Sequence, residues 1–230
     1  MIGIIGAMDI EVQKLKGLLQ GAKTEKISGT EFVTGSICGT DAVIAKCGVG
    51  KVFAAICAQT MIMRYKPEVI INIGVAGGLS KTLGIGDIVV ADGVVQHDMD
   101  TTALGEERGF LSEIGLSVIP TDKKNLELLE TACKECGINC DTGIIASGDQ
   151  FISEAEKKRF ITDTFSAKAC EMEGAAIGQV CYLNGVPFGV LRAISDSAND
   201  NANFDFPTFA ATSAENSAKV IERYIGMLKR

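Results

Sequence analysis

Short apolar runs alternate with segments of helical periodicity along most of the chain. Residues 2–6 and 69–73 are unbroken apolar runs, typical of strands that are covered on both faces of a sheet. Between them, residues 11–19 place apolar side chains at the three- and four-residue spacing of an amphipathic helix. The same patterns predict further strands over 31–38, 42–47, 87–95, 142–146, 169–171 and 187–193. They predict further helices over 52–65, 125–135, 154–161 and 209–229, and one more that follows the 169–171 strand and ends at 184.

This alternation predicts an α/β sandwich, in which one mostly parallel sheet carries helices on both faces. The strands at 31–38 and 42–47 are joined by the turn Gly39-Thr40-Asp41, so part of the sheet should be antiparallel and the whole sheet mixed. No linker, internal repeat or low-complexity tract divides the 230 residues. We therefore expect residues 1–230 to form a single domain that binds ligands at the carboxyl ends of its strands.

Composition and charge narrow the classes of partner. Hydrophobic residues make up 47% of the chain, enough for a sizeable core, and the net charge is −7. An acidic chain with no long basic run is a poor match for nucleic acid or an anionic membrane. No segment is long and apolar enough to span a bilayer. The apolar N-terminal segment, residues 1–8, is followed directly by the acids Asp9 and Glu11. This pattern indicates a buried strand rather than a signal peptide, and it favours a cytoplasmic location.

The eight cysteines raise the question of a disulfide, redox or metal site. Cys133, Cys136 and Cys140 have a partial metal-ligand spacing, but a closed zinc site needs four ligands and the single histidine, His97, is distant in sequence. We expect reduced, structural cysteines and no metal or other cofactor. The remaining five stand singly in apolar stretches, where cysteine acts as a small hydrophobe: Cys38, Cys47, Cys57, Cys170 and Cys181.

Two acids interrupt an otherwise apolar stretch at residues 170–176. Glu171 and Glu173 are two positions apart, so in an extended segment they point the same way. Carboxylates are costly to bury without a partner, and such a pair suits two neighbouring hydroxyl groups, such as those of a ribose. Acids at a helix start, favoured by the helix dipole, explain the same pattern equally well.

Small or acidic residues also follow three other predicted strands: Gly6 to Glu11, Gly74 to Gly78, and Arg192 to Ser197. If the sheet is as predicted, these segments converge with Glu171 and Glu173 on one cleft. The segment from Gly74 is not a dinucleotide fingerprint, because the G-x-G-x-x-G pattern is absent there, and residues 48–51 lack the spacing of a phosphate loop.

Acid–base chemistry in this chain falls to carboxylates, because the single histidine allows no credible Ser-His-Asp or Cys-His set. Glu11, Glu173 and Asp196 stand at strand ends. Paired carboxylates around a scissile bond are the usual equipment for cleaving glycosides through an oxocarbenium-like transition state. Asp196 is equally explained as the N-cap of a following turn.

A set of motifs, matched in order over essentially the whole chain, resembles one known family. They are Ile4-Ile5-Gly6-Ala7-Met8-x-x-Glu11, Gly48-Val49-Gly50-Lys51-Val52, Ile71-Asn72-Ile73-Gly74-Val75-Ala76-Gly77-Gly78, Gly86-Asp87-Ile88-Val89, Ser147-Gly148-Asp149-x-Phe151-Ile152, Glu171-Met172-Glu173 and Arg192-Ala193-Ile194-Ser195-Asp196. The chain resembles the bacterial 5′-methylthioadenosine/S-adenosylhomocysteine nucleosidases, within the wider nucleoside phosphorylase superfamily. The resemblance implies a three-layer αβα fold around a mixed, curved sheet, a homodimer, and hydrolysis of an adenine N-glycosidic bond.

The resemblance also implies roles. Asp196 would protonate the purine at N7, Glu11 would deprotonate the attacking water with Arg192 nearby, and Glu173 would hold the ribose hydroxyls. Phe151 would stack on adenine while the Ile152 backbone reads its edge. The other residues implied to contact the nucleoside are Met8, Val49, Ala76, Gly77, Glu171, Met172, Ser195 and Phe206.

One position departs from the pattern we expect. Val75 stands where many relatives should carry Ser, and the missing hydroxyl would remove one hydrogen bond to the attacking water.

Alternative functions remain a phosphorylase, an AMP nucleosidase, a futalosine hydrolase, a non-catalytic nucleoside-binding module, and a thiol redox protein using Cys133 and Cys136. Two acids near the first strand, Asp9 and Glu11, would repel phosphate and so favour hydrolysis. His97 and Leu104 lie in a region expected to reach across a subunit interface.

Overall fold

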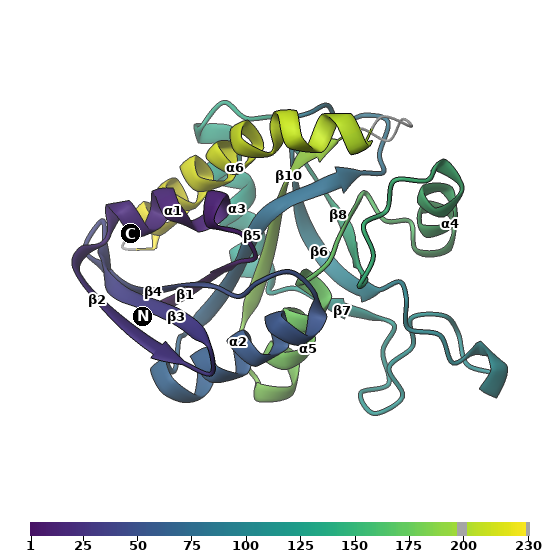
Figure 1. Ribbon diagram of the computed structural model, residues 1–230, viewed down its shortest axis with the longest axis horizontal. Helices are drawn as coiled ribbons and strands as arrows, with labels where there is room; N and C mark the ends of the chain where they lie inside the picture. Colours follow the sequence, from purple (N-terminus) through teal and green to yellow (C-terminus); the bar gives the residue numbers. More distant parts are fainter. Residues whose placement is uncertain (197–201, 229–230) are drawn as a thin grey trace.

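One curved, mixed sheet forms the centre of the molecule in the computed structural model, which describes residues 1–196 and 202–228, without the side chains of 202–208 (Figure 1). Its strands are β1 (Ile2–Gly6), β2 (Gln20–Ile27), β3 (Thr30–Ile37), β4 (Thr40–Lys46), β5 (Val69–Gly78), β6 (Ile88–Gln96), β7 (Val118–Pro120), β8 (Cys140–Ser147), β9 (Ala169–Glu171) and β10 (Phe188–Asp196).

The sheet is open on one side and closes on itself on the other. Strands β2, β3, β4, β1 and β5 lie side by side in that order, and β10, β6, β8 and β9 continue from β5 and return to it. The pairs β1–β4, β1–β5, β5–β10, β6–β8 and β8–β9 are parallel, whereas β10–β6 and β9–β5 are antiparallel. Strand β5 therefore sits at the junction, with its carboxyl end surrounded by the ends of β1, β9 and β10.

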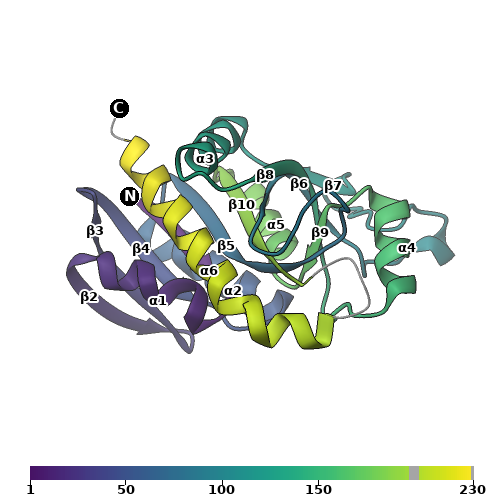
Figure 2. The same cartoon turned by 90° about the horizontal axis from the view of Figure 1, so that it is seen from above.

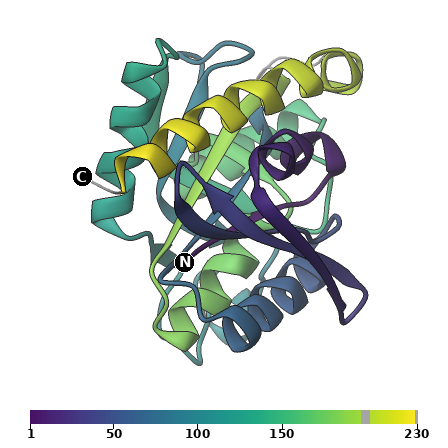
Figure 3. The ribbon, with the colours of Figure 1, turned by 90° about the vertical axis from the view of Figure 1, so that its left-hand side faces the viewer.

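Helices cover both faces of the sheet, as Figures 1 and 3 show. On one face lie α1 (Asp9–Leu18), α3 (Lys123–Glu135) and α6 (Ala202–Met227), and in Figure 2 the long α6 crosses the sheet diagonally. On the other face lie α2 (Lys51–Tyr65) and α5 (Gly174–Asn184), while α4 (Ala155–Phe165) stands at the end beside β9. The expectation of a three-layer αβα arrangement with a mixed sheet is confirmed.

Alternation along the strands explains the two main cores. In β1, Ile4 belongs to the cluster beneath α1, α3 and α6, whereas Ile5 belongs to the cluster beneath α2 and α5. Successive side chains of a strand point to opposite faces, so a continuous apolar run supplies both layers. A third cluster packs under α4 through Ile161, Phe165 and Leu79.

The predicted strands are all present, but the sequence patterns missed β2, β7 and a short 3₁₀ turn at Thr102–Leu104. Strand β2 is exposed along nearly its whole length, so it carries no apolar alternation to recognise. Helix α6 begins at Ala202, seven residues before the predicted start at 209. Within the described residues, no helix has the length and apolar character needed to cross a bilayer.

Candidate active site

A cavity of about 250 Å³ opens at the carboxyl ends of β1, β5, β9 and β10. This volume is near the lower end of small-molecule sites, which span about 300–1,000 Å³. A smaller hollow of about 30 Å³ adjoins it and shares six of its residues. The main cavity is lined by Ala7, Met8, Glu11, Val49, Val75, Ala76, Gly77, Phe151, Cys170, Glu171, Met172, Glu173, Ser195 and Asp196.

Glu11 sits in the first turn of α1, and its carboxylate is fixed by three backbone N–H groups. Oε2 accepts hydrogen bonds from Ala7 and Met8 at 2.7 and 2.9 Å, and Oε1 accepts one from Val75 at 3.0 Å. Glu11 therefore caps its own helix and ties β1 to β5. Burial raises the pKa of Glu11 above its ordinary value, and the Arg192 charge and the three N–H donors oppose the shift without reversing its direction.

Glycine at position 74 leaves the space that Glu11 occupies. A Cβ at Gly74 would lie 2.6 Å from Glu11 Oε1 and 3.5 Å from Arg192 Cζ. The carboxylate and the guanidinium thus approach the same stretch of β5 backbone, as the expectation that Arg192 lies near Glu11 requires. Arg192 itself does not line the cavity; it is 1% exposed and lies behind the cavity wall.

Glu171 is engaged by the protein on both carboxylate oxygens. It pairs with Arg192, which also bonds to Asn72, and it accepts a hydrogen bond from Ser147 Oγ. The backbone N–H groups of Glu173 and Gly174 donate to it at 2.8–3.1 Å, so Glu171 caps the N-terminus of α5. The carboxylate of Glu171 is thus held by the protein while its side chain borders the cavity, and its contact with a ligand stays a prediction.

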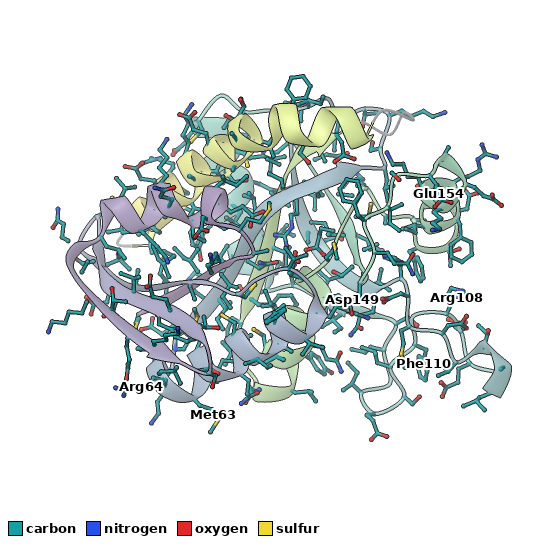
Figure 4. All side chains as sticks on the ribbon, in the orientation of Figure 1. Met63, Arg64, Arg108, Phe110, Asp149 and Glu154 are labelled. Carbon is teal, nitrogen blue, oxygen red and sulfur yellow. The ribbon has the colours of Figure 1, made fainter. Side chains whose placement is uncertain are left out.

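Glu173 faces the cavity and accepts a hydrogen bond from the backbone N–H of Gly50 at 2.8 Å. Gly50 has φ of +103°, a conformation that residues with a side chain rarely adopt, and this backbone turns its N–H toward the carboxylate. The next N–H, of Lys51, donates to Asp149 Oδ1 at 2.8 Å at the start of α2. Asp149 is labelled in Figure 4. Burial, with the neighbouring Glu171 charge, raises the pKa of Glu173 to about 8.

Asp196 reaches the cavity from the end of β10, where the strand is irregular. Ile194 pairs with Ala76 and Asp196 with Gly77, so Ser195 is an extra residue in a bulge. Bulges redirect side chains, and here both Ser195 and Asp196 line the cavity. Ser195 Oγ lies 3.0 Å from Asp196 Oδ1, and Lys158 Nζ lies 3.8 Å from Asp196 Oδ2.

The remaining walls are apolar. Met8, Met172, Val49 and Phe151 line the cavity, and the last two are about half exposed, at 50% and 51%, which places them at its mouth. Ile152 is buried and lines the adjoining hollow together with Gln150. Among the described residues that line either space, none is Lys or Arg.

Most of the predicted site residues therefore gather around one cavity. The side chain of Phe206 lies outside the described part of the chain. His97 is only 6% exposed and packs beneath Gly148, whereas Leu104 is 81% exposed. The expectation that their region reaches across a subunit interface stays a prediction. Sequence patterns missed Ala7, Cys170 and Gln150 as lining residues, as well as the supporting groups Ser147, Asn72 and Lys158.

The cysteine cluster offers no sign of metal or redox chemistry. Cys133 and Cys136 lie in α3 and Cys140 begins β8, away from the cavity. Burial raises the pKa of all three thiols, which disfavours the reactive thiolate. Within residues 1–196 and 202–228, no group of three or more His, Cys, Asp or Glu side chains is arranged to hold a metal ion.

Three carboxylates, Glu11, Glu173 and Asp196, converge on an otherwise apolar cavity. Such a site suits an uncharged or weakly polar ligand that needs one proton donor, one proton acceptor and a partner for hydroxyl groups. Because the cavity walls carry no cation within the described residues, they do not favour a phosphate dianion.

Comparison with known proteins identifies relatives that match the whole chain. A sequence model of the phosphorylase superfamily matches residues 1–226. A 5′-methylthioadenosine/S-adenosylhomocysteine nucleosidase from Shewanella halifaxensis is 40% identical, over 100% of this chain and 99% of the relative.

Solved structures give the same result. The nucleosidase of this name from Neisseria meningitidis, in complex with methylthio-immucillin-A, superimposes with a TM-score of 0.95 at 34% identity, covering 98% of both chains. A futalosine hydrolase from Helicobacter pylori superimposes with a TM-score of 0.93 at 36% identity, covering 98% of this chain and 97% of that one.

Proposed function

The chain belongs to the phosphorylase superfamily, and within it we propose that this protein hydrolyses the N-glycosidic bond of 5′-methylthioadenosine and S-adenosylhomocysteine. The products are adenine and either 5-methylthioribose or S-ribosylhomocysteine. The observation that carries the proposal is the convergence of Glu11, Glu173 and Asp196 on one cavity at the strand ends. The similarity to nucleosidases of this name, over the full length of the chain, supports it.

Asp196 acts as the general acid in this proposal. It donates a proton to adenine N7 as the bond between C1′ and N9 breaks, and the bonding electron pair leaves with the base. A neutral adenine is a better leaving group than its anion, so this proton lowers the barrier. Its position at a bulge, 1% exposed and beside Ser195, supports the role because the side chain is aimed into the cavity and shielded from water.

Glu11 acts as the general base. It takes a proton from a water molecule whose oxygen forms the new bond to C1′. Three N–H donors hold the carboxylate in one orientation, and burial raises its pKa, which makes the ionised carboxylate a stronger base. Arg192, behind the wall, holds Glu171 and contributes positive charge near Glu11 rather than contacting the substrate.

Glu173 binds the ribose hydroxyls. Its carboxylate faces the cavity, and the Gly50 N–H orients it. Phe151, at the mouth, stacks on adenine, and Met8, Val49 and Met172 contact the apolar part of the ribose and its 5′ thioether. Ile152 and Gln150 line the adjoining hollow, where the edge of the base is read.

Hydrolysis is favoured over phosphorolysis by the charges at the first strand. Phosphate recognition normally requires cations or a cluster of N–H groups. Here the N–H groups of Ala7, Met8 and Val75 are already directed at Glu11. A phosphate dianion placed beside Glu11 would be repelled by its carboxylate, whereas a water molecule placed there would be deprotonated by it.

Futalosine hydrolysis is the second candidate, supported by the similarity to the Helicobacter pylori enzyme of that name. Both reactions use a nucleoside and the same acid–base set, so the two differ in the group at the 5′ position and in the base. Direct comparison of the two substrates separates them.

We further propose that residues 1–230 act as one catalytic domain and that the protein is a homodimer. Helices α2 and α5, which pack against each other, carry a surface with exposed apolar side chains: Val52, Phe53, Met63 and Leu183 are each 60–71% exposed. The surface adjoins Val49 at the cavity mouth, so a second copy docked there would border the active site. Free thiols at all eight cysteines support a reducing, cytoplasmic location.

Adenine release tests the reaction. The purified protein is incubated with methylthioadenosine, S-adenosylhomocysteine or futalosine, in the presence and absence of phosphate, and the free base is quantified. We expect phosphate-independent release of adenine, and losses of about 10²–10⁴ in kcat for Asp196→Asn and Glu11→Gln. Glu154→Gln, an exposed acid in the turn before α4, is the control. Release that requires phosphate and yields a ribosyl phosphate would contradict the proposal.

Sedimentation tests the dimer. Phe53→Asp places a charge on the exposed face of α2 and should convert the dimer to a monomer. A matched change on the opposite layer, Lys14→Asp in α1, should leave the dimer intact.

A further inference from the structure

Lys158 is a buried lysine in a helix whose neighbouring lysine is exposed. In α4, Lys157 is half exposed and pairs with Glu154, whereas Lys158 is 4% exposed. Lysine is almost never fully buried unless it is paired. The Lys158 ammonium lies 3.8 Å from Asp196 Oδ2, and Asp196 is itself enclosed. The helix therefore brings a cation to the residue that donates the proton in the proposed reaction.

We propose that Lys158 is a positioning residue for Asp196: its charge holds the acid as an oriented carboxylate in the substrate-free site and sets the upper pH limit of turnover. The inference rests on the proposed function. In each turnover Asp196 takes one proton from solvent and passes it to adenine N7, which returns Asp196 to the carboxylate. Lys158 favours that carboxylate, so it opposes the uptake of the proton.

The geometry indicates that Lys158 acts through its charge. A separation of 3.8 Å is longer than a hydrogen bond, yet well within the range of a strong electrostatic effect in a buried setting. An opposite charge within about 4–6 Å typically stabilises the ionised form of an acid by 1–3 pKa units. Burial of Asp196 works in the other direction, because it disfavours the charged form.

Among the residues that the structure describes, the other groups around this pair do not supply the positive charge of Lys158. The Cys170 thiol faces Asp196 from β9, and burial raises its pKa to about 12, so it is neutral at ordinary pH. Ser195 is uncharged, and the acids that share the cavity supply no positive charge: Glu11, Glu171 and Glu173. Lys158 also lines a separate hollow, together with charged residues of both signs: Lys81, Arg159 and Asp163.

The pH dependence of kcat/KM tests the inference, because its alkaline limb reports the loss of the proton from the essential acid of the free enzyme. Adenine release from methylthioadenosine is measured across pH for the unaltered protein, Lys158→Met, Lys158→Arg and the control Lys157→Met. We expect the alkaline limb of Lys158→Met to move upward by about 1–3 pH units, because removal of the cation lets Asp196 keep its proton. Lys158→Arg, which keeps the charge, and Lys157→Met should retain the original limb.

An alkaline limb in Lys158→Met that coincides with that of the unaltered protein would overturn the role of Lys158. An equal shift in Lys158→Arg would also overturn it, because packing rather than charge would then be responsible. Lys158→Gln, which keeps a polar tip, replaces Lys158→Met if the latter does not fold. Failure of the unaltered protein to release adenine would instead overturn the proposed function, so the two failures are distinguishable.

Discussion

The carboxylate of Glu171, the last residue of β9, and the guanidinium of Arg192 in β10 form an ion pair inside the protein. Both side chains are almost completely enclosed, at 3% and 1% exposure. Asn72 completes the coordination of Arg192, and Ser147 completes that of Glu171. The pair therefore joins β5, β8, β9 and β10 directly behind the cavity, and it fixes the start of α5 that carries Glu173.

Glu171→Gln should destabilise the protein strongly. Removal of one partner of a buried pair leaves the Arg192 charge without compensation, which typically costs about 3–5 kcal/mol. Chemical unfolding measured at neutral pH checks the loss. The control is Glu215→Gln, which breaks an exposed pair with Lys14 and should have a much smaller effect. A midpoint for Glu171→Gln equal to that of the control would show that the pair does not hold this region together.

Glu173→Gln should have the opposite effect on stability, and the effect should depend on pH. The pKa of Glu173 is raised from 4.5 to about 8 in the folded protein, so the folded state keeps a proton that the unfolded state has lost. The stability contributed by this group is complete below about pH 4.5 and is lost as pH rises toward about 8. The glutamine side chain does not ionise, so the variant does not lose this stability as pH rises, and its amide oxygen still accepts the hydrogen bond from the Gly50 N–H.

Thermal unfolding across pH tests the sign of this effect. We expect Glu173→Gln to raise the melting temperature by on the order of 5 °C above about pH 8, and the gain to shrink as the pH falls toward about 5. The same variant should bind nucleoside more weakly, which separates stability from function. A constant difference across the whole range would argue against titration of Glu173.

The apolar pattern predicted the fold well because most strands are covered on both faces. A run such as residues 69–73 has few alternatives to a buried strand, and the helix pattern at 125–135 identifies α3 within two residues of its start. Strand β2 was missed for the converse reason, since its stability comes from pairing with β3 and not from burial of its side chains. Closure of the sheet through β9 and β5 has no local signal, because it depends on a two-residue pairing between distant segments.

The candidate site was predicted as far as strand ends could reveal it. Glu11, Glu173 and Asp196 follow strands that the sequence shows, and the parallel strands β1, β5 and β10 bring their carboxyl ends to one edge. Strand β9 runs antiparallel to β5 and pairs with its last two residues, which brings Glu173 to the same edge. Glu171 and Glu173 differ in their surroundings because Arg192 pairs with Glu171. The position of Arg192 is set by the pairing of β10 with β5, which the sequence pattern does not show. Lys158 had no signal, since a lysine in a charged helix normally faces solvent.

Val75→Ser should modestly increase kcat. Val75 lines the cavity and its N–H donates to Glu11, so a hydroxyl here would stand beside the reacting water. One added hydrogen bond is worth about 0.5–1.5 kcal/mol, or roughly 2–10-fold in rate if it is made in the transition state. Val75→Ala removes the same bulk without adding a hydroxyl. An equal increase in both variants would assign the effect to space instead of hydrogen bonding.

Gly74→Ala should lower kcat by about 10²-fold with little change in KM, because it displaces the general base and leaves the nucleoside contacts in place. The new Cβ would lie 2.6 Å from Glu11 Oε1, so the carboxylate must leave the position that its N–H donors define. Gly17→Ala is the control, since Gly17 has open space around it and alanine stabilises a helix by about 1 kcal/mol relative to glycine. Steady-state kinetics on both variants test this prediction. A kcat of Gly74→Ala equal to that of Gly17→Ala would mean that the orientation of Glu11 does not limit the reaction.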